Sequence, residues 1–191
     1  MNSYPTDAEL VARSVAEPAV FGDLYARHSL AVRRYVVRRI GDAVGDDVAA
    51  EVFVRGFRAR GRYRAERGTA LPWLLGIANN VIADHRRLER RRLAALARLS
   101  NDRDRHAEQS GAALDPALVA ALRRLPAVER DTLLLVVWGE LTQDEAAVAL
   151  GVPVGTVSSR IARARQRLTG ALRSPVPGLA AELRPNGDTH V

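Results

Sequence analysis

The stretch Leu141–Leu168, LTQDEAAVALGVPVGTVSSRIARARQRL, decides the fold of the C-terminal part of the chain. Thr142 followed three residues later by Glu145 forms the pattern of a capping box, which starts a helix by satisfying its first backbone N–H groups. Gly151 stands where this helix must end, because glycine accepts the positive φ of a helix C-terminus. The proline at position 153 suits the start of a second helix. We therefore predict two helices joined by a sharp turn.

The second of these helices carries charge on one side. Val157, Ile161 and Leu168 recur at roughly helical spacing and predict its buried face. Between Pro153 and Arg173 there are five arginines and no acidic residue. A basic helix after a tight turn is typical of a helix-turn-helix, whose second helix enters the major groove of DNA. An α-hairpin with a solvated basic face is the alternative, and the coincidence of the glycine, the small residues and the charge favours DNA.

The composition limits the class of protein. The chain has 191 residues, of which 47% are apolar, so it has room for one larger domain or two small domains with real cores. It has no cysteine, which excludes disulfides, thiolate metal sites and a cysteine nucleophile, and is compatible with a reducing compartment. No run of 18 apolar residues and no signal-peptide pattern occurs. We expect a cytoplasmic protein without membrane insertion.

The charge balance points to a polyanionic partner. The net charge is +7 and the isoelectric point is about 11.0. Every basic side chain other than histidine is an arginine, and the arginine fork suits bidentate contacts to phosphate and guanine. A GC-rich coding sequence explains most of this preference for arginine over lysine. The excess of positive charge still favours nucleic acid.

The rest of the chain is also predicted to be helical. Apolar residues recur at helical spacing in four N-terminal segments and in two that precede the helix-turn-helix: Asp7–Val15, Ala19–Ile40, Asp46–Arg60, Leu71–Leu93, Ala117–Leu125 and Ala127–Trp138. The segment before Asp115 is polar and lacks apolar periodicity, which is typical of a linker. We expect an all-α protein with two small helical domains, residues 5–93 and 114–173. A flexible linker over residues 94–113 joins them, and a mobile tail follows over residues 174–191.

Three motifs together resemble a known family. They are DDVAAEVFVRGFR (Asp46–Arg58), ALPWLLGIANNVIADHRRLERRR (Ala70–Arg92) and LRRLPAVERDTLLLVVWGELTQDEAAVALGVPVGTVSSRIARARQRL (Leu122–Leu168). In this order and spacing they are similar to regions 2 and 4 of the extracytoplasmic-function (group 4) sigma factors of bacterial RNA polymerase. The resemblance covers about residues 5–173. It implies a promoter-specificity subunit whose partners are promoter DNA, the clamp helices and flap of the polymerase core, and an anti-sigma factor.

The helix predicted at Asp46–Arg60 has one polar face. Asp47, Glu51, Arg55 and Arg58 lie at helical spacing, opposite the apolar stripe. These acids can simply complement the helix dipole, with a Glu51–Arg55 pair, and then need no partner. The resemblance implies instead that this helix docks on the polymerase clamp helices. The expected contact residues are Asp46, Asp47, Glu51, Val52, Phe53 and Arg55.

The segment Gly61–Thr69 places a tyrosine among arginines. An aromatic ring between basic groups suits single-stranded DNA, in which an unstacked base packs on a side chain. A solvated loop with Tyr63 tucked into the core is an equally weighted alternative, and Trp73 is expected to be a core residue. Amides on the following helix suit adenine. The resemblance implies capture of a flipped minus-10 base, and the expected residues are Arg60, Arg62, Tyr63, Arg64, Asn79, Asn80, Asp84 and Arg87.

The second helix of the helix-turn-helix is expected to read the minus-35 duplex through Thr156, Ser158, Ser159, Arg160, Ala162, Arg163 and Arg165. The four histidines lack metal-ligand spacing and no catalytic constellation occurs, so we expect no metal, no cofactor and no enzymatic activity. Two other functions stay open. One is an autonomous helix-turn-helix regulator, which would bind DNA alone, and the other is a degenerate sigma-like interaction protein that does not start transcription.

Overall fold

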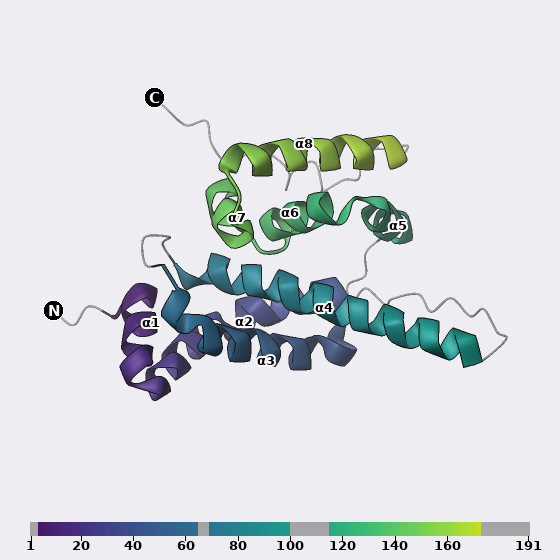
Figure 1. The fold of residues 1–191 in the computed structure, drawn as a ribbon. Helices are drawn as coiled ribbons and strands as arrows, with labels where there is room; N and C mark the ends of the chain where they lie inside the picture. Colours follow the sequence, from purple (N-terminus) through teal and green to yellow (C-terminus); the bar gives the residue numbers. More distant parts are fainter. Residues whose placement is uncertain (1–3, 65–68, 100–114, 173–191) are drawn as a thin grey trace, which may run out of the picture. The chain divides into compact units, whose positions relative to one another are not determined.

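The structure is a computed structural model, which describes residues 4–64, 69–99 and 115–172. The chain divides into two compact units, Met1–Ala112 and Ala113–Val191. The described residues form α-helices and short 3₁₀ helices and contain no strand, which confirms the all-α prediction (Figure 1). The tail over residues 174–191 and most of the expected linker lie outside the described residues.

The described residues of the N-terminal unit form four α-helices. In chain order its elements are α1 (Asp7–Ala16), the 3₁₀ helix η1 (Pro18–Val20), α2 (Phe21–Ile40), α3 (Asp42–Ala59), the 3₁₀ helix η2 (Arg60–Arg62) and α4 (Ala70–Leu99). The core lies between α2, α3 and α4, where apolar side chains recurring along each helix meet. Tyr35, Leu74 and Ile82 are completely buried there.

The α2–α3 contact depends on a glycine. Gly41 has φ 85° and ends α2, and α3 begins directly after it at Asp42, four residues earlier than predicted. One turn into α3, Gly45 packs against Val37: a Cβ atom at Gly45 would lie 2.6 Å from Val37 Cγ2. The absent side chain therefore allows the two helices to approach closely at their junction.

The helix expected over Leu71–Leu93 is longer than predicted, because α4 runs on to Leu99. Alanine, leucine and arginine, which follow one another in this stretch, are among the strongest helix formers. Their propensity continues the helix beyond the last residue that the apolar pattern identified.

The C-terminal unit has the predicted helix-turn-helix. Its helices are α5 (Pro116–Arg124), α6 (Ala127–Val137), α7 (Gln143–Leu150) and α8 (Val154–Ala171). The capping box is confirmed, because the Thr142 hydroxyl accepts from the Glu145 N–H and the Glu145 carboxylate accepts from the Thr142 N–H. Gly151 adopts the predicted left-handed conformation, with φ 65°. Val157 and Ile161 are buried, so the predicted inner face of α8 is also confirmed.

Candidate DNA-binding and polymerase-binding surfaces

The exposed side of α8 begins with short side chains. Ser158, Ser159 and Ala162 are exposed, and Thr156 is half-buried. The Ser158 hydroxyl donates to Gln143 Oε1 of α7, and the Ser159 hydroxyl donates to the Thr156 carbonyl at 3.0 Å. These contacts keep both hydroxyls close to the helix surface. Short side chains of this kind permit close approach of another molecule to the first turns of α8.

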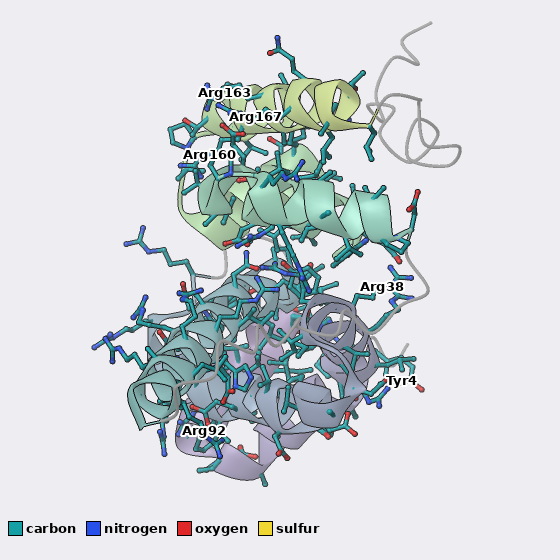
Figure 2. The ribbon with its side chains drawn as sticks, turned by 90° about the vertical axis from the view of Figure 1, so that its right-hand side faces the viewer. Tyr4, Arg38, Arg92, Arg160, Arg163 and Arg167 are labelled. Carbon is teal, nitrogen blue, oxygen red and sulfur yellow. The ribbon has the colours of Figure 1, made fainter. Side chains whose placement is uncertain are left out.

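The arginines of α8 differ in their surroundings. Figure 2 labels Arg163 and Arg167 on α8. Both approach the carboxylate of Glu129 on α6, with Nε–O distances of 3.4 and 3.1 Å. The Glu129 side chain is only 7% exposed, whereas those of the two arginines are 54% and 58% exposed. Their Nε atoms thus face the protein while most of each side chain stays in solvent. The ion pairs with Glu129 of α6 therefore limit the directions in which the side chains of Arg163 and Arg167 can point.

Two further arginines of the expected minus-35 set are half-buried. Arg165 lies partly inside the domain, and burial lowers the pKa of its guanidinium. Arg160 is also half-buried, and among the described residues no carboxylate lies within ion-pair distance of it. Of the seven residues expected to read the duplex, Arg165 is the one whose position suits packing more than contact with DNA.

Acid–arginine pairs run along the polar face of α3. Arg33 Nε of α2 lies 2.6 Å from Asp46 Oδ1, and the contact raises the pKa of Arg33. Arg55 donates to Glu51 at 2.9 Å and to Asp84 of α4 at 2.8 Å. The Asp84 and Glu51 carboxylates raise the pKa of Arg55. The Glu51–Arg55 pair considered from the sequence is thus present, and it extends to a second helix.

Exposure separates the expected docking residues into two groups. Asp46 and Asp47 are exposed, and Glu51 and Arg55 are half-buried. Val52 and Phe53 do not lie on this face and correct our expectation, since both are buried. The Phe53 ring packs edge-on against Tyr25, with 4.7 Å between the ring centroids. These two apolar side chains pack into the core on the opposite side of α3 from its charged face.

Asn79 is also placed differently from the expectation. It is only 7% exposed, and its Oδ1 accepts from the Tyr35 hydroxyl at 2.6 Å and from Arg39 Nη1 at 2.9 Å. Arg39 Nη1 donates to the Tyr35 hydroxyl as well, at 2.6 Å. Asn79 therefore belongs to a buried polar network between α2 and α4, whereas its neighbour Asn80 is exposed. Because its side chain is buried and its Oδ1 is bonded twice inside the protein, Asn79 serves the fold and is not available to a base in this structure.

Two members of the expected minus-10 set form an ion pair at the edge of the polar face. Asp84 lies 3.5 Å from Arg87, in addition to its contact with Arg55. The hydrogen bond from Arg55 is the main reason why the pKa of Asp84 is lowered. Asp84 is therefore a link between α3 and α4 as much as a surface acid.

The residues around η2 combine anchored and exposed side chains. Arg62 and Arg64 are exposed, and Tyr63 is half-buried with its ring centroid 5.2 Å from that of Trp73. Burial raises the pKa of Tyr63, and the charge of Asp7 adds to this effect. Arg60 donates from Nε to the Ser14 carbonyl, so it is held against α1. Residues 65–68 lie outside the described residues.

Sequence reasoning missed two buried acids. Asp7, at the start of α1, is 6% exposed and accepts hydrogen bonds from Arg27 at 2.6 Å and from the Ala70 N–H at 2.7 Å. His28 Nε2 lies 2.7 Å from Asp7 Oδ2, the oxygen that also accepts from the Ala70 N–H. Glu129, the second acid, holds the arginines of α8. The partners of both acids lie far away in the chain, so no local pattern identifies them.

The comparisons with known proteins agree with this architecture. Residues 24–92 match sigma-70 region 2 and residues 116–168 match sigma-70 region 4. The ECF RNA polymerase sigma factor SigC of Mycobacterium tuberculosis is 38% identical over 141 residues, which cover 72% of this chain and 75% of SigC. The chain belongs to the extracytoplasmic-function sigma factors. As a sigma factor it binds RNA polymerase and directs it to promoter DNA.

Other relatives of this sigma factor match it over nearly their whole length. RNA polymerase sigma factor CnrH of Cupriavidus metallidurans is 30% identical over 187 residues, covering 90% of this chain and 97% of CnrH. The solved structure of CnrH in complex with the cytosolic domain of CnrY has a TM-score of 0.63 and 27% identity, and covers 89% of this chain and 99% of CnrH. The structure of RpoE in complex with the anti-sigma factor NepR from Bartonella quintana, at 19% identity, shares the fold with a TM-score of 0.60.

Within the described ranges, no group of three or more histidine or acidic side chains is arranged to hold a metal ion. None of the helices in residues 4–64, 69–99 and 115–172 combines the length and the apolar character that a membrane crossing requires.

Proposed function

We propose that the two units of this sigma factor divide promoter recognition between them. In this proposal residues 114–173 read the minus-35 duplex, and residues 5–93 bind the polymerase core and the opened minus-10 strand. The observation that carries the proposal is the two-sided α8, which buries Val157 and Ile161 and exposes Ser158, Ser159 and Arg163. A helix with this division, preceded by a tight turn, fits the major groove.

Duplex reading is assigned to the exposed side of α8. Arg160 and Arg163 contact bases or phosphates through their guanidinium forks, and the short side chains of Ser158, Ser159 and Ala162 let the helix enter the groove. Thr156 contributes at the helix start. Arg165 is left out of the direct contacts, because its Nε atom is buried in the domain, whereas that of Arg160 is not among the buried atoms.

Core binding is assigned to the polar face of α3. Asp47, Glu51 and Arg55 are the residues whose charges reach solvent there, and Asp46 lies beside them in its pair with Arg33. Opposite charges on a partner can replace the internal pairs at little cost, because exposed ion pairs contribute only about 0–1 kcal/mol. This makes the face suitable for a reversible, salt-sensitive interface.

Strand capture is assigned to Arg62, Tyr63, Arg64 and Asn80. Tyr63 presents part of its ring beside Trp73, and the two arginines on either side of it are exposed. Stacking of a base on an aromatic ring contributes about 1–3 kcal/mol and tolerates any base. Asp84 and Arg87 line the neighbouring surface of α4. The protein supplies binding free energy to the melted DNA and no catalytic chemistry of its own.

An inhibitor protein completes the proposal. The solved relatives are complexes of CnrH with the cytosolic domain of CnrY and of RpoE with the anti-sigma factor NepR. We propose that this sigma factor too has an anti-sigma partner, which would cover DNA-binding or core-binding residues in storage.

The decisive experiment compares promoter binding with and without polymerase core. Wild-type protein is expected to shift promoter DNA only together with core, whereas an autonomous regulator would bind alone and an inactive sigma-like protein would not bind at all. Arg160→Ala in the holoenzyme should weaken promoter binding by about 1–3 kcal/mol and relax one position of the minus-35 element if the arginine reads a base. Arg124→Ala, an exposed arginine on α5, is the matched control. Equal promoter affinity and selectivity of both variants and wild type would overturn the assignment of α8.

A further inference from the structure

Helix α1 contacts both ends of the segment that carries the strand-capture residues. At the far end of that segment, Asp7 Oδ2 accepts a hydrogen bond from the N–H of Ala70, the first residue of α4, at 2.7 Å. The first N–H groups of a helix have no partner within the helix, so Asp7 supplies one from another element. Asp7 belongs to the first turn of α1, and the start of α4 is thereby fastened to α1.

At the near end of the segment, Arg60 is fastened to the other end of α1. Its Nε donates to the carbonyl of Ser14 at 3.1 Å. The same guanidinium donates to the Phe57 carbonyl at 2.6 Å and stacks over the Phe57 ring, 3.8 Å from its centroid. Ser14 itself is completely buried, and its hydroxyl donates to the Val11 carbonyl. Arg60 therefore has little freedom to move away from α1.

The anchor at Asp7 is a buried carboxylate with a full set of donors. Arg27 Nη1 lies 2.6 Å from one oxygen, and His28 Nε2 lies 2.7 Å from the other. Burial alone raises the pKa of Asp7, but the Ala70 N–H, the Arg27 guanidinium and His28 together hold it below its usual value. Arg27 also donates to the Pro5 carbonyl at 2.9 Å. A charged, multiply bonded group of this kind fixes geometry more firmly than an exposed pair.

We propose that α1 is a brace for strand capture, in which Asp7 is the positioning residue. By holding Arg60 at one end and Ala70 at the other, α1 keeps Tyr63 and its flanking arginines ready for an unpaired strand. Figure 1 shows α1 at the end of the N-terminal unit where η2 and the start of α4 lie. Ordering these side chains in advance reduces the conformational cost of binding DNA. The inference rests on the proposed assignment of strand capture to Arg62, Tyr63, Arg64 and Asn80.

The test uses the full chain in holoenzyme, on a promoter that the wild-type protein transcribes in runoff assays. Asp7→Asn keeps the shape of the side chain and removes its charge. Asp23→Asn, at an exposed acid in the first turn of α2, is the matched control, and Tyr63→Ala tests the proposed function separately. Measurements are core affinity, the rate of opening of a duplex promoter by permanganate reactivity, and affinity for the same promoter mismatched over the minus-10 region.

We expect Asp7→Asn to reduce the opening rate and the affinity for the mismatched promoter about two- to tenfold, the factor that corresponds to ordering one side chain. The core affinity of Asp7→Asn should stay within about twofold of wild type, since the proposed core-binding face of α3 lies away from the brace. The control Asp23→Asn should behave as wild type in every measurement, since Asp23 takes no part in the brace. Wild-type opening by Asp7→Asn, with impaired opening by Tyr63→Ala, would overturn the brace and leave strand capture standing. Wild-type opening by both variants would overturn strand capture and the brace with it. An equal loss of core affinity and strand affinity in Asp7→Asn would show that Asp7 acts only through the fold.

Discussion

Replacement of Glu129 by glutamine is expected to loosen α8 from α6. Removing one partner of a fully buried ion pair costs about 3–5 kcal/mol, and breaking an exposed pair costs about 0–1 kcal/mol. The Glu129 side chain is buried, but Arg163 and Arg167 are each more than half exposed and regain water when they are released. The expected loss of stability of the C-terminal unit therefore lies between these limits, at about 1–3 kcal/mol.

Unfolding in urea can report this unit separately. The chain has two tryptophans, and they belong to different units: Trp73 lies in α4 and Trp138 follows α6. In a Trp73→Phe background the fluorescence of Trp138 follows the C-terminal unit. With a urea dependence of about 1 kcal/mol per molar for a small domain, the midpoint for Glu129→Gln should fall by about 1–3 M. Asp144→Asn, at an exposed acid in the first turn of α7, is the control and should cost at most about 1 kcal/mol.

A double-mutant cycle makes the reasoning refutable. If Glu129 stabilises the unit through Arg167, then Arg167→Ala should cost less in the Glu129→Gln background than in the wild-type background, with a coupling of about 0.5–3 kcal/mol. A midpoint for Glu129→Gln no lower than that of Asp144→Asn, or additive effects in the cycle, would show that the buried carboxylate does not hold α8.

Three further predictions concern stability. Gly45→Ala should destabilise the N-terminal unit by about 1–3 kcal/mol in urea unfolding, because the new Cβ would lie 2.6 Å from a valine methyl of α2. Gly22→Ala is the control, because Gly22 has open space around it, and should be neutral or stabilising by up to about 1 kcal/mol. Gly151→Ala should cost the C-terminal unit about 1–2 kcal/mol, because φ 65° is unfavourable for a residue with a Cβ. The lowered pKa values of Asp7 and Asp84 stabilise the folded state above about pH 4, and this contribution is lost as the pH falls through the folded-state values. Acid unfolding of Asp7→Asn should therefore depend less steeply on pH than that of wild type.

Features set by neighbouring residues could be predicted from the sequence. The capping box at Thr142 and the left-handed Gly151 both depend on contacts within a few residues, and both are present. The buried face of α8 followed from apolar spacing alone. The all-α fold and the helix-turn-helix could therefore be predicted from the sequence.

The candidate site was less predictable, because periodicity does not tell which face of a helix meets the protein. Asn79 lies on the side of α4 that faces α2, where Tyr35 and Arg39 bind its amide, although its polarity suggested exposure. Val52 and Phe53 belong to the apolar stripe of α3 and lie beneath the face assigned to the polymerase. The placement of Asn79 depends on distant parts of the chain, which a local pattern does not contain. The burial of Val52 and Phe53 agrees with the local apolar spacing, and the resemblance alone had assigned them to the polymerase.

The outer part of α4 has a consequence for how the helix exchanges its amide hydrogens. From Leu88 to Ala95 no side chain is buried, and Leu88 itself is 62% exposed. Figure 1 shows this end of the helix extending past α2 and α3 within its unit. Backbone hydrogen bonds without tertiary packing open at free energies far below that of global unfolding. Protection against deuterium should therefore fall along α4 from Ile82 outward, and this end of the helix should unwind and re-form many times for each unfolding of the core.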